Sequence, residues 1–335
     1  MNKNNIEIII VGFASIDIFK IDNSISKSDN TNEFLAVPGG SSANVAVDLS
    51  KLGVKTGLIG KLGQDMFGDI LIETLEKYNV NTEGIVFTEE VRTPLVFISK
   101  KDKKKVLFYR NPGSDMKLQK GDIKKALFEK AFIFHFDSVS LTDEPELSAI
   151  YQALDYARYN NQIISFDVNY RKVLWKDREL ALSRINKAIK AADLIKLNSY
   201  ELRFVSGEED INKGINRILE ISDKIRMVVV TDGDKGSYIR IGKSFKHVNA
   251  LDIPVVETTG CGDSFMAAFL SRILEILKKG SRLDNMTNES LEKILLYSNA
   301  AGAITSSKYG VIPVLPTKNE LADFLDSRGL MISFN

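Results

Sequence analysis

The stretch that decides the fold assignment reads Glu257-Thr258-Thr259-Gly260-Cys261-Gly262-Asp263-Ser264-Phe265. Two glycines flank one small residue, and a carboxylate follows directly. From Phe265 onward, apolar residues recur at three- and four-residue spacing as far as Leu277, which predicts a helix. A glycine-rich turn at a helix N-terminus offers free N–H groups and the positive end of the helix dipole to an anion such as phosphate.

This arrangement suits phosphoryl transfer. Gly260, Cys261 and Gly262 would form an anion hole, and Asp263 would take a proton from an attacking hydroxyl. The same tetrapeptide is also compatible with an ordinary turn in which the aspartate caps a helix. The rest of the chain has to decide between the two interpretations.

Composition indicates a globular enzyme of ordinary charge. The 335 residues are 44% hydrophobic and 27% charged, with a net charge of +1, so no nucleic-acid-binding surface is indicated. One cysteine excludes an internal disulfide and fits a reducing compartment. No signal peptide or transmembrane run is visible, and we therefore expect a cytoplasmic protein without a membrane partner.

Short apolar runs alternate with amphipathic stretches along the chain, which predicts a mostly parallel sheet covered by helices on both faces. The expected strands are 7–11, 56–59, 131–136, 163–168, 194–197 and 227–231. The expected helices are 42–52, 66–78, 146–159, 179–191, 211–221, 264–278 and 291–306. Two further pairs of predicted strands do not follow this alternation of strand and helix and look antiparallel. They are 13–19 with 34–37 and 93–99 with 105–110.

Other motifs fail. Gly242-Lys243-Ser244 lacks the first glycine of a P-loop, and the position of the third glycine of a dinucleotide fingerprint is Phe265. With only His135, His247 and Cys261 as soft ligands, a structural zinc site is not expected. His135, between two phenylalanines, is interpreted as a packed strand residue, and His247 as a surface strand residue.

The chain resembles the ribokinase-like (PfkB-type) carbohydrate kinases. The segment 258–265 is similar to their C-terminal signature, and Pro38-Gly39-Gly40-Ser41-Ser42-Ala43-Asn44 is similar to their N-terminal one. The resemblance implies a three-layer α/β/α fold with a small β-sheet lid. We therefore expect a single kinase domain over residues 1–335, with lid insertions at about 13–37 and 93–112.

The resemblance also implies where the sugar binds. Asp17, which follows the first strand, would accept hydrogen bonds from sugar hydroxyls, beside Gly39, Gly40 and Asn44. The helix after Gly40 is expected to be capped by Ser41 or Ser42 and closed by Gly53.

Within the family, the run Phe108-Tyr109-Arg110-Asn111-Pro112 and the segment 165–175, with Asn169 and Arg171, are most similar to fructokinases. Arg110 and Arg171 would bind sugar oxygens. Related 2-keto-3-deoxygluconate kinases carry arginines in these places to hold a substrate carboxylate, and a salt bridge in the lid is the structural alternative.

The nucleotide site is likewise implied by the resemblance. Asn198, Thr231, Gly233, Gly236 and Asn299 would contact ATP. Glu201 would help to position Mg²⁺ through water. Glu257 replaces the aspartate usual in the loop that binds a monovalent cation, so potassium activation is not expected to be strong.

We thus predict an ATP-dependent sugar kinase, a fructokinase that phosphorylates the C6 hydroxyl. A homodimer is one oligomeric state that the sequence leaves open. The alternatives are a kinase of keto-deoxygluconate, ribose or a nucleoside, and a catalytically silent regulator that binds sugar or nucleotide. The Cys261 thiol could have a lowered pKa at the helix N-terminus, or could be a buried and inert small residue.

Overall fold

The computed structural model describes residues 5–21, 33–98 and 106–330. The predicted strands 13–19 and 93–99 each overlap one observed strand, at Ser15–Ile21 and Leu95–Ile98. The loop 23–32 and the lysine-rich tip 100–104 lie outside the described residues. The side chains of Ile21 and Asn285 are likewise not described.

A nine-stranded sheet forms the centre of the molecule, in the order β13-β12-β11-β10-β9-β8-β1-β4-β5. All neighbours from β11 to β5 are parallel, and β12 and β13 form an antiparallel edge. The strands are β1 (Ile8–Val11), β4 (Thr56–Gly63), β5 (Asn81–Thr88), β8 (Ile133–Asp137), β9 (Ile163–Asp167), β10 (Leu194–Asn198), β11 (Met227–Thr231), β12 (Ser237–Ile241) and β13 (Ser244–Val248).

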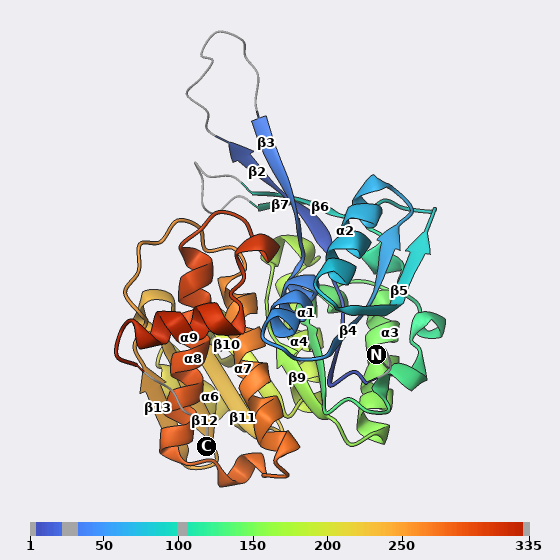
Figure 1. Cartoon of the computed structure of the whole chain (residues 1–335). Coiled ribbons are helices and arrows are strands. Elements are labelled where there is room, and N and C mark those ends of the chain that lie inside the picture. Colours follow the sequence, from blue (N-terminus) through green and yellow to red (C-terminus); the bar gives the residue numbers. More distant parts are fainter. Residues whose placement is uncertain (1–4, 22–32, 99–105, 331–335) are drawn as a thin grey trace.

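Helices cover both faces of this sheet (Figure 1). They are α1 (Ser41–Lys51), α2 (Met66–Lys77), α3 (Glu146–Tyr159), α4 (Arg178–Ala191), α5 (Ser199–Ser206), α6 (Ile211–Leu219), α7 (Cys261–Lys278), α8 (Asn288–Ser306) and α9 (Lys318–Asp326). Strand β1 shows how the layers form, because Ile9 and Val11 pack into the core with α3 to α6 while Ile8 and Ile10 pack with α1, α2, α7 and α8. The three-layer α/β/α prediction is confirmed.

A second sheet of four strands, in the order β3-β2-β6-β7, projects from one end of the molecule (Figure 1). Its strands are β2 (Ser15–Ile21), β3 (Glu33–Gly39), β6 (Leu95–Ile98) and β7 (Val106–Tyr109). The pairs β2–β3 and β6–β7 are antiparallel, and β2 pairs with β6 in parallel. The predicted small sheet is therefore present, assembled from the two insertions.

Some expectations were wrong in detail. Sequence analysis missed β5 and α9, which carry short or weakly periodic apolar patterns. The helix cap at α1 is also different, because the N-cap is Gly40, with a φ of 95° and no side-chain cap. Ser41 instead donates to Asp137, and the Ser42 hydroxyl accepts from the Phe13 N–H at 3.2 Å.

Candidate active site

The N-terminus of α7 meets the carboxyl ends of the central strands. Its N-cap is Gly260, whose φ of 82° is a left-handed conformation that favours glycine. A Cβ at Gly260 would also lie 2.6 Å from Val311 Cγ1. The helix starts at Cys261, so Gly262 and Asp263 stand in its first turn, where N–H groups have no partner within the helix.

Asp263 is held in place from the opposite helix. Asn44 Nδ2, in the first turn of α1, donates to Asp263 Oδ2 at 2.8 Å. Asn44 is 3% exposed, and its Oδ1 has no hydrogen-bond partner among the described residues. The pair joins the two glycine-rich segments, which lie 219 residues apart, and leaves one buried amide oxygen available to a ligand.

Burial raises the pKa of Asp263 to about 6. The hydrogen bond from Asn44 opposes this change, Asp167 adds to it, and Arg171 and Lys196 oppose it. A carboxylate with a pKa close to working pH is well matched to proton abstraction.

Asp17 lies on the small sheet and faces the same site. It is 5% exposed, its Oδ1 accepts from Ser15 Oγ at 3.0 Å, and burial raises its pKa to about 7, with Asp263 adding to the effect. A Cβ at Gly39 would stand only 2.4 Å from Asp17 Oδ2. The glycine pair therefore gives this carboxyl the room it occupies.

Arg110 has a different position from the one expected of a sugar-binding residue. It is 5% exposed, with Nε bonded to Asp115, Nη1 donating to Thr142 Oγ1 at 3.0 Å and Nη2 donating to Glu146 Oε2 at 3.0 Å. All its nitrogens thus have acceptors within the protein, which agrees with the salt-bridge alternative. Arg171, in contrast, is exposed and acts electrostatically on both Asp17 and Asp263.

Asn169 has a left-handed φ of 37° and is 6% exposed. Its Nδ2 donates to Asp137 Oδ2 at 3.1 Å, at the ends of two adjacent strands. The residue therefore belongs to the polar floor of the site.

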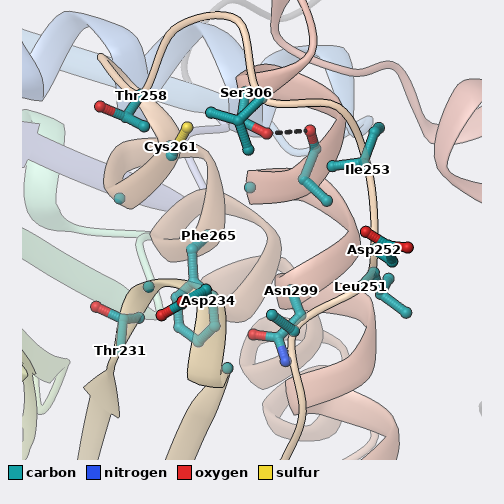
Figure 2. A pocket seen from close by; sticks show the side chains of 17 residues that line it. Thr231, Asp234, Leu251, Asp252, Ile253, Thr258, Cys261, Phe265, Asn299 and Ser306 are labelled. Atoms are coloured by element: carbon teal, nitrogen blue, oxygen red, sulfur yellow. Dashed lines mark hydrogen bonds between the residues drawn. The ribbon is translucent and has the colours of Figure 1, made fainter.

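A cavity of about 570 Å³ lies beside the start of α7 (Figure 2). It is lined by Thr231, Gly233, Gly236 and Asn299, and also by Cys261 and Gly262. Four of the five residues expected to contact a nucleotide thus line one cavity that opens on the predicted anion hole.

Sequence analysis missed the apolar wall of this cavity. It is formed by Leu251, Ile253, Val255 and Phe265, with Gly302 and Ala303 from α8 (Figure 2). Of the three consecutive small residues that follow Asn299 on α8, Gly302 lines the cavity, as the small-residue pattern suggests, whereas Ala300 and Ala301 are buried in the core. The loop 249–258 has no helical or strand periodicity, so no pattern marks it in the sequence.

Asn198 does not line the cavity. It caps α5, with its Oδ1 accepting from the Glu201 N–H at 2.8 Å. Glu201 is 1% exposed, and its two carboxylate oxygens accept from the N–H groups of Asn198 and Tyr170, each at 2.8 Å. Each oxygen keeps a second lone pair, which fits an outer role toward hydrated Mg²⁺ rather than a closed cage.

No group of three or more metal-ligating side chains occurs within the described ranges. Over these same residues, no helix is long and apolar enough to cross a membrane.

Cys261 contradicts one of the two expectations. Burial, with Asp263 and Glu257 nearby, raises the pKa of its thiol to about 12. The helix N-terminus does not compensate for these effects, so the thiolate is disfavoured, while Cys261 itself is only partly buried and lines the cavity. His135 is a packed strand residue as expected, 2% exposed and bonded to Ser165 Oγ at 3.0 Å.

Comparison with known proteins identifies the class. The model of the pfkB family carbohydrate kinases matches residues 5–318, and the chain belongs to that family. It is therefore a phosphotransferase that acts on an alcohol group of a carbohydrate.

Individual relatives are similar over the full length. The protein named "Probable fructokinase-5" of Arabidopsis thaliana is 37% identical over 324 residues, which is 96% of this chain and 98% of the relative. The fructokinase of Xylella fastidiosa, solved with ATP, has a TM-score of 0.87 at 27% identity and covers 98% and 100% of the two chains. A double-mutant fructokinase of Vibrio cholerae O395, with fructose, ADP and potassium, has a TM-score of 0.85 at 26% identity over 96% and 99%.

Proposed function

We propose that this kinase transfers the γ-phosphoryl group of ATP to the C6 hydroxyl of D-fructose, within a single domain formed by the whole chain. The observation that carries the proposal is the pairing of Asn44 with Asp263 at the mouth of the α7 turn. It combines a carboxylate of suitable pKa, a glycine-rich helix start and a buried amide oxygen without a partner among the described residues.

In this proposal, Asp17 and Asn44 hold the sugar hydroxyls, with Gly39 and Gly40 allowing close approach to the backbone. Asp263 accepts the proton of the attacking hydroxyl. The N–H groups from Gly260 to Asp263 stabilise the charge on the moving group, a contribution of about 3 kcal/mol for one donor in comparable anion holes.

The nucleotide would occupy the 570 Å³ cavity, with its base against the apolar wall and its phosphates toward Gly262. Mg²⁺, when bound with ATP, supplies charge neutralisation on the phosphates. Glu201 would hold its water shell, and Asn198 would fix Glu201 by capping the same helix.

The state of Arg110 supports fructose over a sugar acid. Asp115 and Glu146 already neutralise this guanidinium, so it carries no uncompensated charge for a substrate carboxylate. Arg171 alone faces the open site. We infer that Arg110 fixes the β7 end of the lid, while Arg171 contacts the neutral ketose.

Turnover assays across fructose, ribose, keto-deoxygluconate and adenosine, with and without potassium, test this proposal. We expect fructose to have the highest kcat/KM. We expect little change without potassium, because Glu257 Oε1 already accepts three hydrogen bonds from Thr258 and Thr259. A higher kcat/KM for the sugar acid would overturn the substrate assignment, and no turnover with any sugar would favour a silent binding protein.

We further propose that two copies associate through the outer face of the small sheet. Phe34, Leu107 and Tyr109 are 52%, 57% and 64% exposed there. Phe97 lies between them, with ring centroids 6.1 Å from Phe34 and 5.0 Å from Tyr109. A cytoplasmic location remains our expectation, because the single cysteine fits a reducing compartment.

A further inference from the structure

Lys196 lies beneath the anion-binding turn. It comes from β10 and is 6% exposed, and a Cβ built on Gly262 would lie 3.5 Å from its Nζ. The roles proposed so far involve Asn198, Glu201 and the α7 turn. None of them involves the ammonium group of Lys196.

The ammonium group is only partly satisfied by the protein. Its Nζ donates to Asp167 Oδ2 at 2.8 Å, which is its single hydrogen bond among the described residues. Glu201 is close enough to interact electrostatically, but its oxygens accept backbone N–H groups instead. An ammonium has three N–H donors, so two remain for another acceptor.

The charge of Lys196 is secure. Burial alone would lower its pKa, but Asp167, Glu201 and Asp263 outweigh that effect and raise the pKa above the ordinary value. The group is therefore a permanent cation at any pH at which the enzyme would work.

Gly262 separates this cation from the nucleotide cavity, which it lines together with Cys261. Its φ is not positive, so the backbone there does not require glycine. Glycine inside a helix costs roughly 1 kcal/mol relative to alanine. The missing side chain instead keeps the space between Nζ and the cavity open.

We propose that Lys196 is a catalytic residue that donates to the transferring phosphoryl group of ATP, from the side opposite the sugar, while Asp167 holds its ammonium in position. This inference rests on the function proposed above. The arrangement adds a full positive charge to the partial charges of the α7 N–H groups, at the point where negative charge moves during transfer.

The alternative is that Lys196 only neutralises Asp167. Replacement by methionine distinguishes the two, because a group that contacts the γ-phosphoryl group affects ATP and not ADP. In Lys196→Met we expect the Kd of a non-hydrolysable ATP analogue to rise about 10- to 100-fold, with the Kd of ADP changed far less. We expect kcat with fructose to fall about 10²- to 10³-fold.

Two further variants control for the unpaired carboxylate and for stability. Asp167→Asn combined with Lys196→Met removes the uncompensated charge and should keep the selective loss of ATP binding. Lys61→Met removes another lysine–aspartate pair of 2.8 Å, with Asp122, on β4. It should leave the ratio of the two Kd values unchanged.

Equal losses for ATP analogue and ADP in Lys196→Met, or unchanged binding of both, would overturn the inference. A failure of the proposed function looks different, because fructose would then not be the preferred substrate of the wild-type enzyme, whichever way Lys196→Met changes the two Kd values. If Lys196→Met does not fold, the double variant provides the same comparison.

Discussion

At the scale of single residues, the site depends on carboxyl groups whose pKa values are raised by burial. Asp263 and Asp17 lie on different elements, and burial is the largest cause of the raised pKa of each carboxyl. The charge of Asp263 raises the pKa of Asp17 further. A sugar bound between them would replace the missing water with hydroxyl donors.

The first prediction follows from the raised pKa of Asp263. A general base must be ionised, so kcat should be constant above a pH of about 6 and should fall about tenfold per unit below it. A pH profile of kcat measures this directly. Asp17→Asn is the control, since it removes the other titrating carboxyl, and the acid limb should persist. Loss of that limb in the control would assign it to Asp17.

Asp263 and Asn44 could be proposed from the sequence because each lies in a signature of the family that the chain resembles, and the structure brings the two into hydrogen-bond contact. The sequence patterns could not predict the burial of Arg110. Its partner Glu146 lies 36 residues away on α3, and no local pattern links them. The same limit applied to Cys261, because its pKa depends on Glu257 and on burial rather than on the helix N-terminus alone.

At the scale of elements, the two faces of the small sheet have different tasks. Alternation along β2 places Asp17 on the face toward Asp263 and Ile18 on the other face, beside Ala36 and Phe97. The inner face thus completes the site. The outer face exposes Phe34, Leu107 and Tyr109, and a group of exposed apolar side chains is typical of a surface that meets another protein.

We therefore predict that the protein is a dimer in solution and that Leu107→Asp is a monomer. Leu107 is 57% exposed, so the charge should not disturb the fold of one copy. Analytical ultracentrifugation gives the mass. Tyr159→Asp, at a 72% exposed position on α3, is the matched control and should remain dimeric. A monomeric wild-type protein would rule out the proposed interface.

The elements themselves were largely predictable, because the buried strands are continuous apolar runs and the long helices are strongly periodic. The exceptions have physical reasons. Strand β5 has a mixed burial pattern at the sheet edge, and α9 has only nine residues and two buried leucines. Helix α1 lacks a serine cap because its first hydroxyl groups bond to Asp137 and to the Phe13 N–H.

At the scale of the whole molecule, the candidate site is formed by segments that lie far apart in the sequence and meet in the fold. The α7 turn lies more than 200 residues along the chain from both the α1 start and β2, yet Asn44 and Asp263 are in hydrogen-bond contact. The order and type of the elements predicted a parallel sheet. Because ligands bind at the carboxyl ends of parallel strands, the segments that follow those strands were expected to lie close together. The apolar nucleotide wall was not predictable, because it is built from an irregular loop.

The most direct test of the account is fructose-dependent turnover of Asp263→Asn, measured together with its binding of fructose and ATP. The amide is nearly isosteric and can keep the contact with Asn44, so both ligands should bind within a few-fold of wild type. We predict that kcat falls about 10²- to 10⁴-fold. Turnover close to that of the wild-type enzyme, with binding intact, would contradict the assignment of Asp263 as the base.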